Sequence, residues 1–259
     1  VHGDRPEPLA AAIVGVFNNI RVAHVEGGEL SGTVDGLIRH SVSKLAHAHF
    51  VSTDEARDRL IKMGERNKSI FVIGAPSIDR MLSDDLPDLA DVLEHYQIPF
   101  STYAIFVFHP VTSELSLLEE KTSEVVRALE ASGLNFIVIY PNNDLGTDKI
   151  KKVLGRLVGN PKFVVTRSMR FDSYLTLLKN ASFIIGNSSS GLCEAPVYGV
   201  PTINIGSRQQ GRLMGPSVVN VREEWSLIFE QIKKVMHNQK RFPVSSDYGK
   251  GKSDVKFVR

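Results

Sequence analysis

The sequence predicts an α/β protein built on parallel sheets. Along its 259 residues, short apolar runs alternate with longer stretches in which apolar residues recur at helical spacing. The apolar runs end in loops rich in glycine, serine, asparagine and charged residues. A short buried strand followed by an amphipathic helix is the repeating unit of a parallel sheet. These observations predict Rossmann-like domains, whose ligands bind at the carboxyl ends of the strands.

The first part of the chain has three apolar runs and three helical patterns. We expect strands at 21–25, 49–52 and 69–73, and helices at 8–17, 35–47 and 54–63. The chain opens with Val1-His2-Gly3-Asp4-Arg5, which has the character of a strand end followed by a turn. We therefore expect the chain to be a fragment whose N-terminal domain is incomplete.

The alternation is interrupted at residues 86–100, which carry Pro87 and Pro99, and then restarts. We expect strands at 103–108, 135–140, 162–166, 183–185, 202–205 and 218–221, with helices at 115–132, 149–158, 171–179 and 223–237. The predicted domains are therefore a partial Rossmann-like domain over 1–98 and a nearly complete one over 99–259. The last segment of the chain is expected to return toward the first domain.

Composition excludes several classes of protein. Apolar residues make up 42% of the chain and charged residues 23%, as in globular proteins with a core. A net charge of +2 gives no electrostatic reason to expect binding to nucleic acid or membrane, and no apolar run reaches the ~20 residues of a membrane span. Cys193 is the single cysteine, which excludes an internal disulfide and favours a reducing, cytoplasmic setting. No HExxH, CxxC, GxxxxGK[ST] or GxGxxG motif is present, so we expect no metal site and no P-loop.

The strongest functional signal is the loop Gly186-Asn187-Ser188-Ser189-Ser190-Gly191. It follows the apolar run 183–185 and precedes a predicted helix that begins at Leu192. Small residues let backbone N–H groups approach an anion, and a helix N-terminus attracts negative charge. We therefore expect a phosphorylated ligand, most simply a nucleotide, at this loop.

A second loop supports the same interpretation. The strand 202–205 is followed by Gly206-Ser207-Arg208-Gln209, in which Arg208 can bind phosphate through two N–H groups. Arg208 and Arg212 can equally be solvated surface residues. Glu194, on the helix after the serine loop, can accept hydrogen bonds from ribose hydroxyls, as acids do in dinucleotide-binding folds.

Three acidic residues of the first domain follow strand ends or open a helix: Asp4, Glu26 and Asp35. Asp35 and Arg39 share a helix face, which by itself indicates a surface ion pair more often than a catalytic one. All three acids nevertheless fall at carboxyl-end positions of one small domain. We interpret them as candidates for general acid and base catalysis.

Two further candidates follow strands of the second domain. His109, after the run 103–108, is as often a packed strand-end residue as a functional one, but in this loop it can contact phosphate or donate a proton. Asn142 lies in Pro141-Asn142-Asn143-Asp144, which can also be a plain turn. We expect the ligand in a cleft between the two domains.

Seven segments occur in one order over nearly the whole chain: His2-Gly3-Asp4-Arg5, residues 24–33 (His-Val-Glu-Gly-Gly-Glu-Leu-Ser-Gly-Thr), Ile38-Arg39-His40, residues 108–112 (Phe-His-Pro-Val-Thr), Pro141-Asn142-Asn143-Asp144, the serine loop 186–191, and Gly206-Ser207-Arg208-Gln209. In this order they resemble the hydrolysing UDP-N-acetylglucosamine 2-epimerases of sialic acid biosynthesis. The bacterial capsule-type enzymes look closest, and the epimerase part of the animal bifunctional enzyme is similar.

The resemblance implies two Rossmann-like domains in the glycosyltransferase-B arrangement and a homo-oligomer, either dimer or tetramer. It implies conversion of UDP-N-acetylglucosamine and water to N-acetylmannosamine and UDP. The implied route is anti elimination of UDP to a 2-acetamidoglucal, followed by addition of water with inversion at C2. It implies no cofactor and no metal.

The resemblance also assigns roles to residues of this chain. Asp4, Glu26 and Asp35 are the implied catalytic acids, without an assignment of the one that takes the C2 proton. His109 is implied to contact the diphosphate or to assist the departure of UDP. The remaining positions are implied to bind or support UDP and the sugar: Ser188, Ser189 and Arg208 for the diphosphate, Glu194 for the ribose, and Arg5, Arg39 and Asn142 as support.

This chain departs from the family pattern in places. The family's first strand and its glycine/arginine phosphate loop are absent, Gly36 stands where a second acid is usual, and Pro6 and Pro8 open a helix that is usually free of proline. The alternatives are a non-hydrolysing epimerase, a glycosyltransferase of the same fold, and a catalytically silent protein that binds a nucleotide sugar. The Glu-Gly-Gly-Glu and Asn-Ser-Ser-Ser sequences favour the hydrolysing branch, with the sugar either N-acetylglucosamine or a 4-acetamido-6-deoxy analogue.

Overall fold

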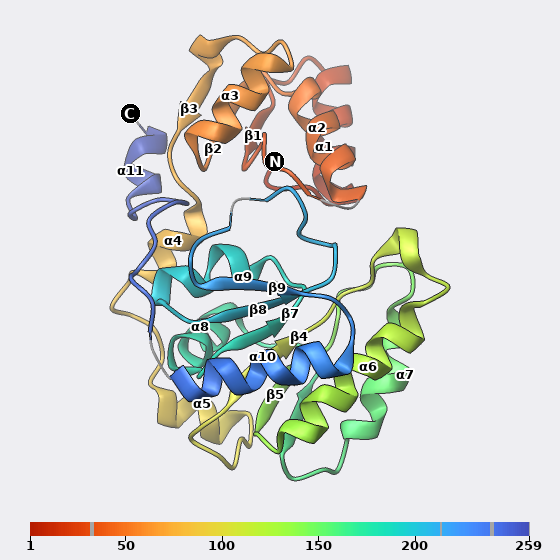
Figure 1. Cartoon of the computed structure of the whole chain (residues 1–259). Coiled ribbons are helices and arrows are strands. Elements are labelled where there is room, and N and C mark those ends of the chain that lie inside the picture. The colour runs from red at the N-terminus through yellow and green to blue at the C-terminus, as the bar shows by residue number, and fades with distance from the viewer. Residues whose placement is uncertain (32–33, 213, 239–240, 259) are drawn as a thin grey trace. The chain divides into compact units, whose positions relative to one another are not determined.

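The computed structural model describes residues 1–31, 34–212, 214–238 and 241–258 (Figure 1). Gly32 and Thr33, which belong to one of the matching segments, lie outside the described residues. The chain forms two compact units. Unit 1 comprises Val1–Ser83, Gln210–Arg212 and Ser246–Arg259, and unit 2 comprises Asp84–Gln209 and Leu213–Ser245.

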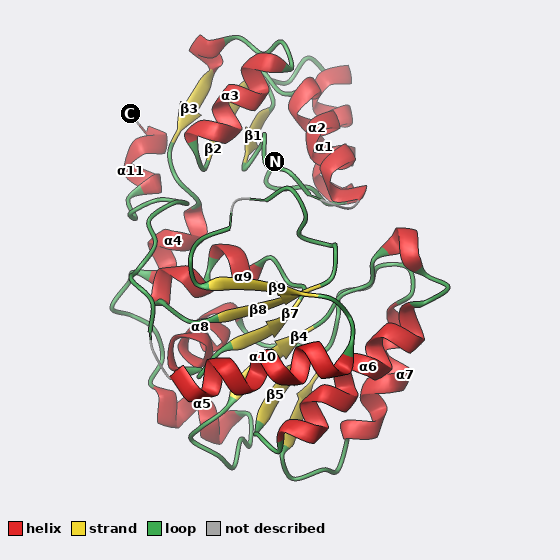
Figure 2. Cartoon of the chain, in the orientation of Figure 1, coloured by secondary structure: helices red, strands yellow, loops and turns green. Residues whose placement is uncertain are grey.

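Unit 2 is built on a parallel sheet of six strands in the order β6-β5-β4-β7-β8-β9 (Figure 2). The strands are β4 (Ala104–Val107), β5 (Phe136–Ile139), β6 (Phe163–Thr166), β7 (Ile184–Gly186), β8 (Thr202–Ile205) and β9 (Val218–Val221). Numbered within the unit, this order is 3-2-1-4-5-6, the order of dinucleotide-binding folds. In such sheets the ligand site lies where the order reverses, which here is beyond the carboxyl ends of β4 and β7.

Helices cover both faces of this sheet. They are α5 (Leu89–His95), α6 (Leu118–Ser132), α7 (Thr147–Leu154), α8 (Phe171–Asn180), α9 (Ser190–Cys193) and α10 (Trp225–Asn238), with short 3-10 turns η2 (Thr112–Glu114), η3 (Gly155–Leu157) and η4 (Ala195–Tyr198). Side chains of β4 alternate between two cores: Ala104 and Phe106 pack with α6, α7 and α10, whereas Ile105 and Val107 pack with α5 and α8. Burial on both faces explains why β4 is apolar throughout.

Unit 1 contains a parallel sheet with the order β1-β2-β3. Its elements are α1 (Pro6–Phe17), β1 (Ala23–Val25), α2 (Val34–Leu45), β2 (Ala48–Val51), α3 (Asp54–Lys62), η1 (Asn67–Ser69), β3 (Ile70–Val72), α4 (Pro76–Met81) and α11 (Ser253–Val258). His2 forms a parallel bridge with Val25, and the Val25 N–H donates to the Val1 carbonyl at 3.0 Å. The segment before α1 therefore lies beside β1, which brings Asp4 to the carboxyl edge of this sheet.

The α/β class with parallel sheets is confirmed, but the units divide after Ser83, whereas the sequence predicts a boundary after residue 98. The reason is the packing of α5, whose Val92 joins the core of unit 2. In addition, the Thr176 hydroxyl donates to the Pro87 carbonyl at 2.9 Å. The proline-flanked interruption marks a break in the pattern, but it does not show which core the enclosed helix joins.

The last segment of the chain groups with unit 1. Asp79 on α4 accepts hydrogen bonds from the N–H and hydroxyl of Ser253, both at 2.7 Å, and from the Asp254 N–H at 3.2 Å. The Phe257 ring lies 4.3 Å, centroid to centroid, from that of Phe50 on β2. Within the described ranges, no helix is long and apolar enough to cross a membrane.

Candidate active site

In unit 2, a reciprocal pair of hydrogen bonds joins the loops after β4 and β7. Asn187 accepts the backbone N–H of His109 at 2.6 Å, and its side-chain amide donates to the His109 carbonyl at 2.9 Å. The Asn187 N–H donates to the Val107 carbonyl at 3.1 Å. Asn187 is 1% exposed. These bonds fix the two loops at the point where the strand order reverses.

The path of the serine loop depends on glycine at both ends. Gly186 has a φ of +133°, and a Cβ there would lie 1.9 Å from the Val107 carbonyl oxygen. At Gly191 a Cβ would lie 2.6 Å from a methyl group of Thr202 on β8. Glycine therefore lets the loop run close to two strands. The helix α9 begins at Ser190, not at Leu192 as predicted, with Ser189 as its N-cap.

The loop after β8 lies against the backbone carbonyl group of Asn187. Arg208 and Gln209, both buried, donate to the Asn187 carbonyl at 3.3 and 2.8 Å respectively. Ser188 and Arg208, two of the predicted diphosphate-binding residues, therefore belong to chain segments that meet at Asn187. Burial of Arg208 argues against the interpretation of this residue as solvated surface.

His109, Asn142 and Glu194 also have defined surroundings within unit 2. The Asn142 N–H donates to Nδ1 of His109 at 3.2 Å, so a neutral His109 carries its proton on Nε2. The Asn142 side-chain amide donates to Asp144 at 2.6 Å. The pKa of Tyr198 is raised to about 12, first by burial and then by the charge of Glu194. Burial and then the charge of Glu194 also raise the pKa of Tyr174, so this carboxylate lies near both phenol groups.

In unit 1, a buried arginine holds Asp4. Arg39 on α2 donates to Asp4 through Nη2, whereas its Nε and Nη1 are buried without a hydrogen-bond partner among the residues that the structure describes. Burial raises the pKa of Asp4, against the opposing charge of Arg39, and the nearby charge of Asp35 adds to this rise. Asp35 lies 3.8 Å from Arg5, oxygen to nitrogen.

The pKa of Glu26 is shifted in the opposite direction. Glu26 has a φ of +63°, and its Oε2 lies 3.0 Å from Nε2 of His2. Burial would raise the pKa of Glu26, but the hydrogen bond from His2 and the charges of His2 and Arg39 outweigh burial and lower it. The Glu26 hydrogen bond in turn raises the pKa of His2. The pKa values of Asp4 and Glu26 are therefore shifted in opposite directions within one unit.

A buried histidine supports the turn that carries Asp4. His24 on β1 is 0% exposed, with Nε2 2.9 Å from the Gly3 carbonyl and Nδ1 3.0 Å from the Ser43 hydroxyl. A carbonyl can only accept, so Nε2 carries the proton and Nδ1 accepts from Ser43. Burial lowers the pKa of His24 to about 4, which keeps the ring neutral.

A family model described as UDP-N-acetylglucosamine 2-epimerase matches residues 1–259. The chain belongs to the UDP-N-acetylglucosamine 2-epimerase family. It is 49% identical over 234 residues to the UDP-N-acetylglucosamine 2-epimerase of Neisseria meningitidis serogroup B, covering 90% of this chain and 62% of that protein. It is 37% identical to the polysialic acid biosynthesis protein P7 of Escherichia coli, covering 90% of this chain and 60% of that protein. The chain thus spans under two thirds of the length of these two relatives.

Solved structures of this family share the fold. The UDP-N-acetylglucosamine 2-epimerase of Methanocaldococcus jannaschii, in complex with UDP-N-acetylglucosamine and UDP, matches with a TM-score of 0.83 at 22% identity. That of Neisseria meningitidis, bound to UDP-N-acetylglucosamine, matches with a TM-score of 0.81 at 18% identity. Each match covers 100% of this chain and 74% of the other.

Several residues of this epimerase-family chain have a place in the site that the motifs alone do not indicate. Asn187 links two loops of unit 2, His2 pairs with Glu26, and His24 holds the turn before Asp4. Arg212, considered with Arg208 as a phosphate-binding residue, groups with unit 1 and donates to the Leu30 carbonyl at 2.8 Å. Asn187, His2 and His24 lie inside matching segments, but a segment does not show which partner its side chain contacts.

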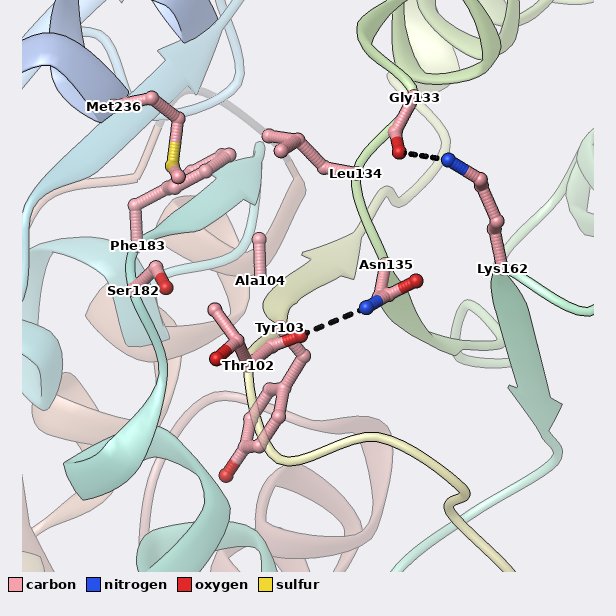
Figure 3. A pocket seen from close by; sticks show the side chains of 10 residues that line it. All are labelled: Thr102, Tyr103, Ala104, Gly133, Leu134, Asn135, Lys162, Ser182, Phe183 and Met236. Carbon is pink, nitrogen blue, oxygen red and sulfur yellow. Dashed lines mark hydrogen bonds between the residues drawn. The ribbon is translucent and has the colours of Figure 1, made fainter.

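Two further observations bear on the site. Among the described residues, no three His, Cys, Asp or Glu side chains are grouped so that they could hold a metal ion. A pocket of about 200 Å³ in unit 2 is lined by Tyr103, Asn135 and Phe183, among others (Figure 3). It lies at the amino ends of the strands, opposite to the edge that carries His109 and Asn187. It is therefore separate from the candidate nucleotide site.

Proposed function

We propose that this chain acts as a hydrolysing UDP-N-acetylglucosamine 2-epimerase, which converts UDP-N-acetylglucosamine and water to N-acetylmannosamine and UDP. The observation that carries the proposal is the opposite direction in which the pKa values of Asp4 and Glu26 are shifted, on adjoining segments of unit 1. Groups whose surroundings push their pKa values apart are suited to act as acid and base in one reaction. Family membership supports the choice of substrate.

In the proposed first step, a carboxylate removes the proton from C2 and UDP leaves from C1. Glu26 suits the base, because its lowered pKa keeps it ionised at neutral pH. Loss of the anomeric C–O bond places negative charge on the departing diphosphate. In unit 2, Arg208 and the backbone N–H groups of Ser188 and Ser189 are the groups proposed to stabilise that charge.

In the proposed second step, water adds its hydroxyl group to C1 of the glucal and loses its other proton to solvent, while a proton adds at C2 on the opposite face. Asp4 suits the proton donor, because burial raises its pKa. The buried Nε and Nη1 of Arg39, which lack partners among the described residues, can bind an oxygen of the sugar. Asp35, close enough to raise the pKa of Asp4, is proposed to tune that acid.

The test is turnover of UDP-N-acetylglucosamine by the 259-residue chain in ¹⁸O-labelled water. We expect labelled N-acetylmannosamine and unlabelled UDP, since the C1–O bond breaks. Recovery of intact UDP-N-acetylmannosamine would show the non-hydrolysing reaction instead. Asp4→Asn should lower kcat by at least about 100-fold while UDP still binds. Normal turnover by Asp4→Asn would remove this residue from the mechanism.

A second substrate is favoured by one comparison. The chain is 34% identical to the UDP-N,N'-diacetylbacillosamine 2-epimerase (hydrolyzing) of Legionella pneumophila, covering 97% of this chain and 67% of that protein. Parallel assays with UDP-N-acetylglucosamine and UDP-N,N'-diacetylbacillosamine measure kcat/KM for both sugars. The larger value identifies the substrate, and the elimination and hydration steps are the same for either.

A further inference from the structure

A lysine in unit 2 lies between two carboxylates that come from different loops. Lys121 on α6 donates to the carboxylate of Glu114 in η2, and to Oε1 of Glu223, in the loop between β9 and α10, at 3.2 Å. The Lys121 side chain is 26% exposed and that of Glu223 12%. The three charges are therefore partly shielded from solvent, where an ion pair is stronger than on an open surface.

Both carboxylates contact the loop after β8. The Ser207 hydroxyl donates to Oε1 of Glu114 at 3.0 Å. At Gly206, which has a φ of +75°, an added Cβ would lie 2.4 Å from Oε1 of Glu223. Glu223 therefore packs directly on the backbone of Gly206. The hydrogen bond from Lys121 lowers the pKa of Glu114 and keeps this acceptor ionised.

The next two residues of the same loop are Arg208 and Gln209, which donate to the Asn187 carbonyl. The loop is thus held at Gly206-Ser207 by the carboxylates and at 208–209 by Asn187. A loop that is fixed before its ligand arrives loses less conformational entropy on binding. Without Lys121, two like charges would repel each other across the loop.

We propose that Lys121 is a positioning residue for diphosphate binding, because it holds Glu114 and Glu223 against the loop that presents Arg208. This inference rests on the proposed function, in which Arg208 binds the diphosphate of UDP. Lys121 acts through the loop and does not itself contact the ligand. Its removal should therefore weaken the binding of a diphosphate more than the binding of a monophosphate.

The experiment is calorimetric titration of the 259-residue chain with UDP and with UMP. Lys121→Met should bind UDP about tenfold more weakly, which corresponds to about 1.4 kcal/mol, and UMP less than about threefold more weakly. Lys121→Arg should restore most of the UDP affinity. The matched control is Lys152→Met, because Lys152 pairs with Glu119 at 2.7 Å on the open surface, where its side chain is 71% exposed. It should bind UDP like the parent.

Loss of a cation near the site would also weaken UDP binding through long-range charge, but salt screens that effect. The UDP defect of Lys121→Met should therefore persist at 0.5 M salt, where the Debye length is about half of its value at physiological salt. Ser207→Ala, which removes only the hydroxyl contact to Glu114, should weaken UDP binding about threefold and provides a milder variant if Lys121→Met does not fold.

The outcomes separate the two proposals. Failure of the parent chain to bind UDP would refute the proposed function. If the parent binds UDP, parental affinity in both Lys121→Met and Ser207→Ala would overturn the positioning role. Equal losses for UDP and UMP, or a defect abolished by salt, would also overturn it, because they would show general destabilisation or a charge effect.

Discussion

Replacement of Asn187 by alanine tests whether one buried amide organises the proposed nucleotide-binding edge of unit 2. The side chain satisfies the backbone N–H and carbonyl of His109, at 2.6 and 2.9 Å. Alanine removes both of these hydrogen bonds to the main chain of a partly buried residue. The backbone carbonyl of residue 187 remains available to Arg208 and Gln209, so the loop after β8 keeps its contact.

The expected cost follows from the two lost hydrogen bonds. Each is worth about 1–1.5 kcal/mol, so Asn187→Ala should lower the free energy of unfolding by about 2–3 kcal/mol. For a unit of this size the melting temperature should fall by about 4–10 °C. Asn204→Ala is the matched control. Asn204 is equally buried, but among the described residues its side chain bonds to the side chain of exposed Asn220, at 2.7 Å, and to no backbone group. Loss of the hydrogen bond between Asn204 and Asn220 should lower the free energy of unfolding by about 1 kcal/mol.

Urea and thermal unfolding of the parent and both variants measure these differences, and calorimetry with UDP measures the effect on binding. Below its melting temperature, Asn187→Ala should bind UDP at least about tenfold more weakly, while Asn204→Ala should bind it normally. Equal destabilisation by the two substitutions would refute the claim that Asn187 satisfies backbone groups at this edge. Parental UDP affinity in Asn187→Ala would refute its link to nucleotide binding.

Three further predictions concern unit 1. The pKa of His24 is lowered to about 4 from 6.5, so between these two pH values the residue gains a proton on unfolding. Its stabilisation is therefore fully present above pH 6.5 and is lost as the pH falls toward 4. The loss, about 3 kcal/mol, should be absent from His24→Gln in urea titrations across that range. Asp79→Ala removes the acceptor for Ser253 and should cost about 1–2 kcal/mol, seen as faster hydrogen exchange over 246–258. Glu29→Gln should lower kcat/KM at least about tenfold, with no loss of stability above about 0.5 kcal/mol. The reason is that burial raises the pKa of Glu29, while its buried Oε1 has no hydrogen-bond partner among the described residues. A larger loss of stability in urea unfolding would show that this carboxyl has a structural role.

The sequence predicts most strands of the fold because the sheet is parallel and buried on both faces. Runs such as 103–108 and 183–185 are then apolar throughout, and this signal is hard to mistake. The unit boundary depends on a different kind of information. The helix α5 carries an apolar face but no sign of the core to which it belongs, so the division after Ser83 emerges only from the packing of Val92.

The candidate site shows the same difference between local and long-range information. The sequence allows the selection of Gly186, Gly191 and Arg208. A tight backbone approach requires glycine and a basic loop contains arginine, and both are visible in the local composition. The partnership of Asn187 with His109 spans 78 positions, and that of His24 with Gly3 spans 21. No local pattern reports such a contact, and only the sheet order brings these residues together.

The electrostatic contrast between Asp4 and Glu26 originates in one short turn. His2 lowers the pKa of Glu26 by its hydrogen bond, and Asp4 lies just beyond Gly3, whose carbonyl accepts from His24. The strand that contains His24 leads directly into Glu26. A displacement of this turn would therefore take His2 away from Glu26 and Asp4 away from Arg39 at the same time. Because one buried imidazole holds the turn, the contacts that shift the pKa values of the proposed base and the proposed acid depend on the same short segment, and a displacement of that segment would change both.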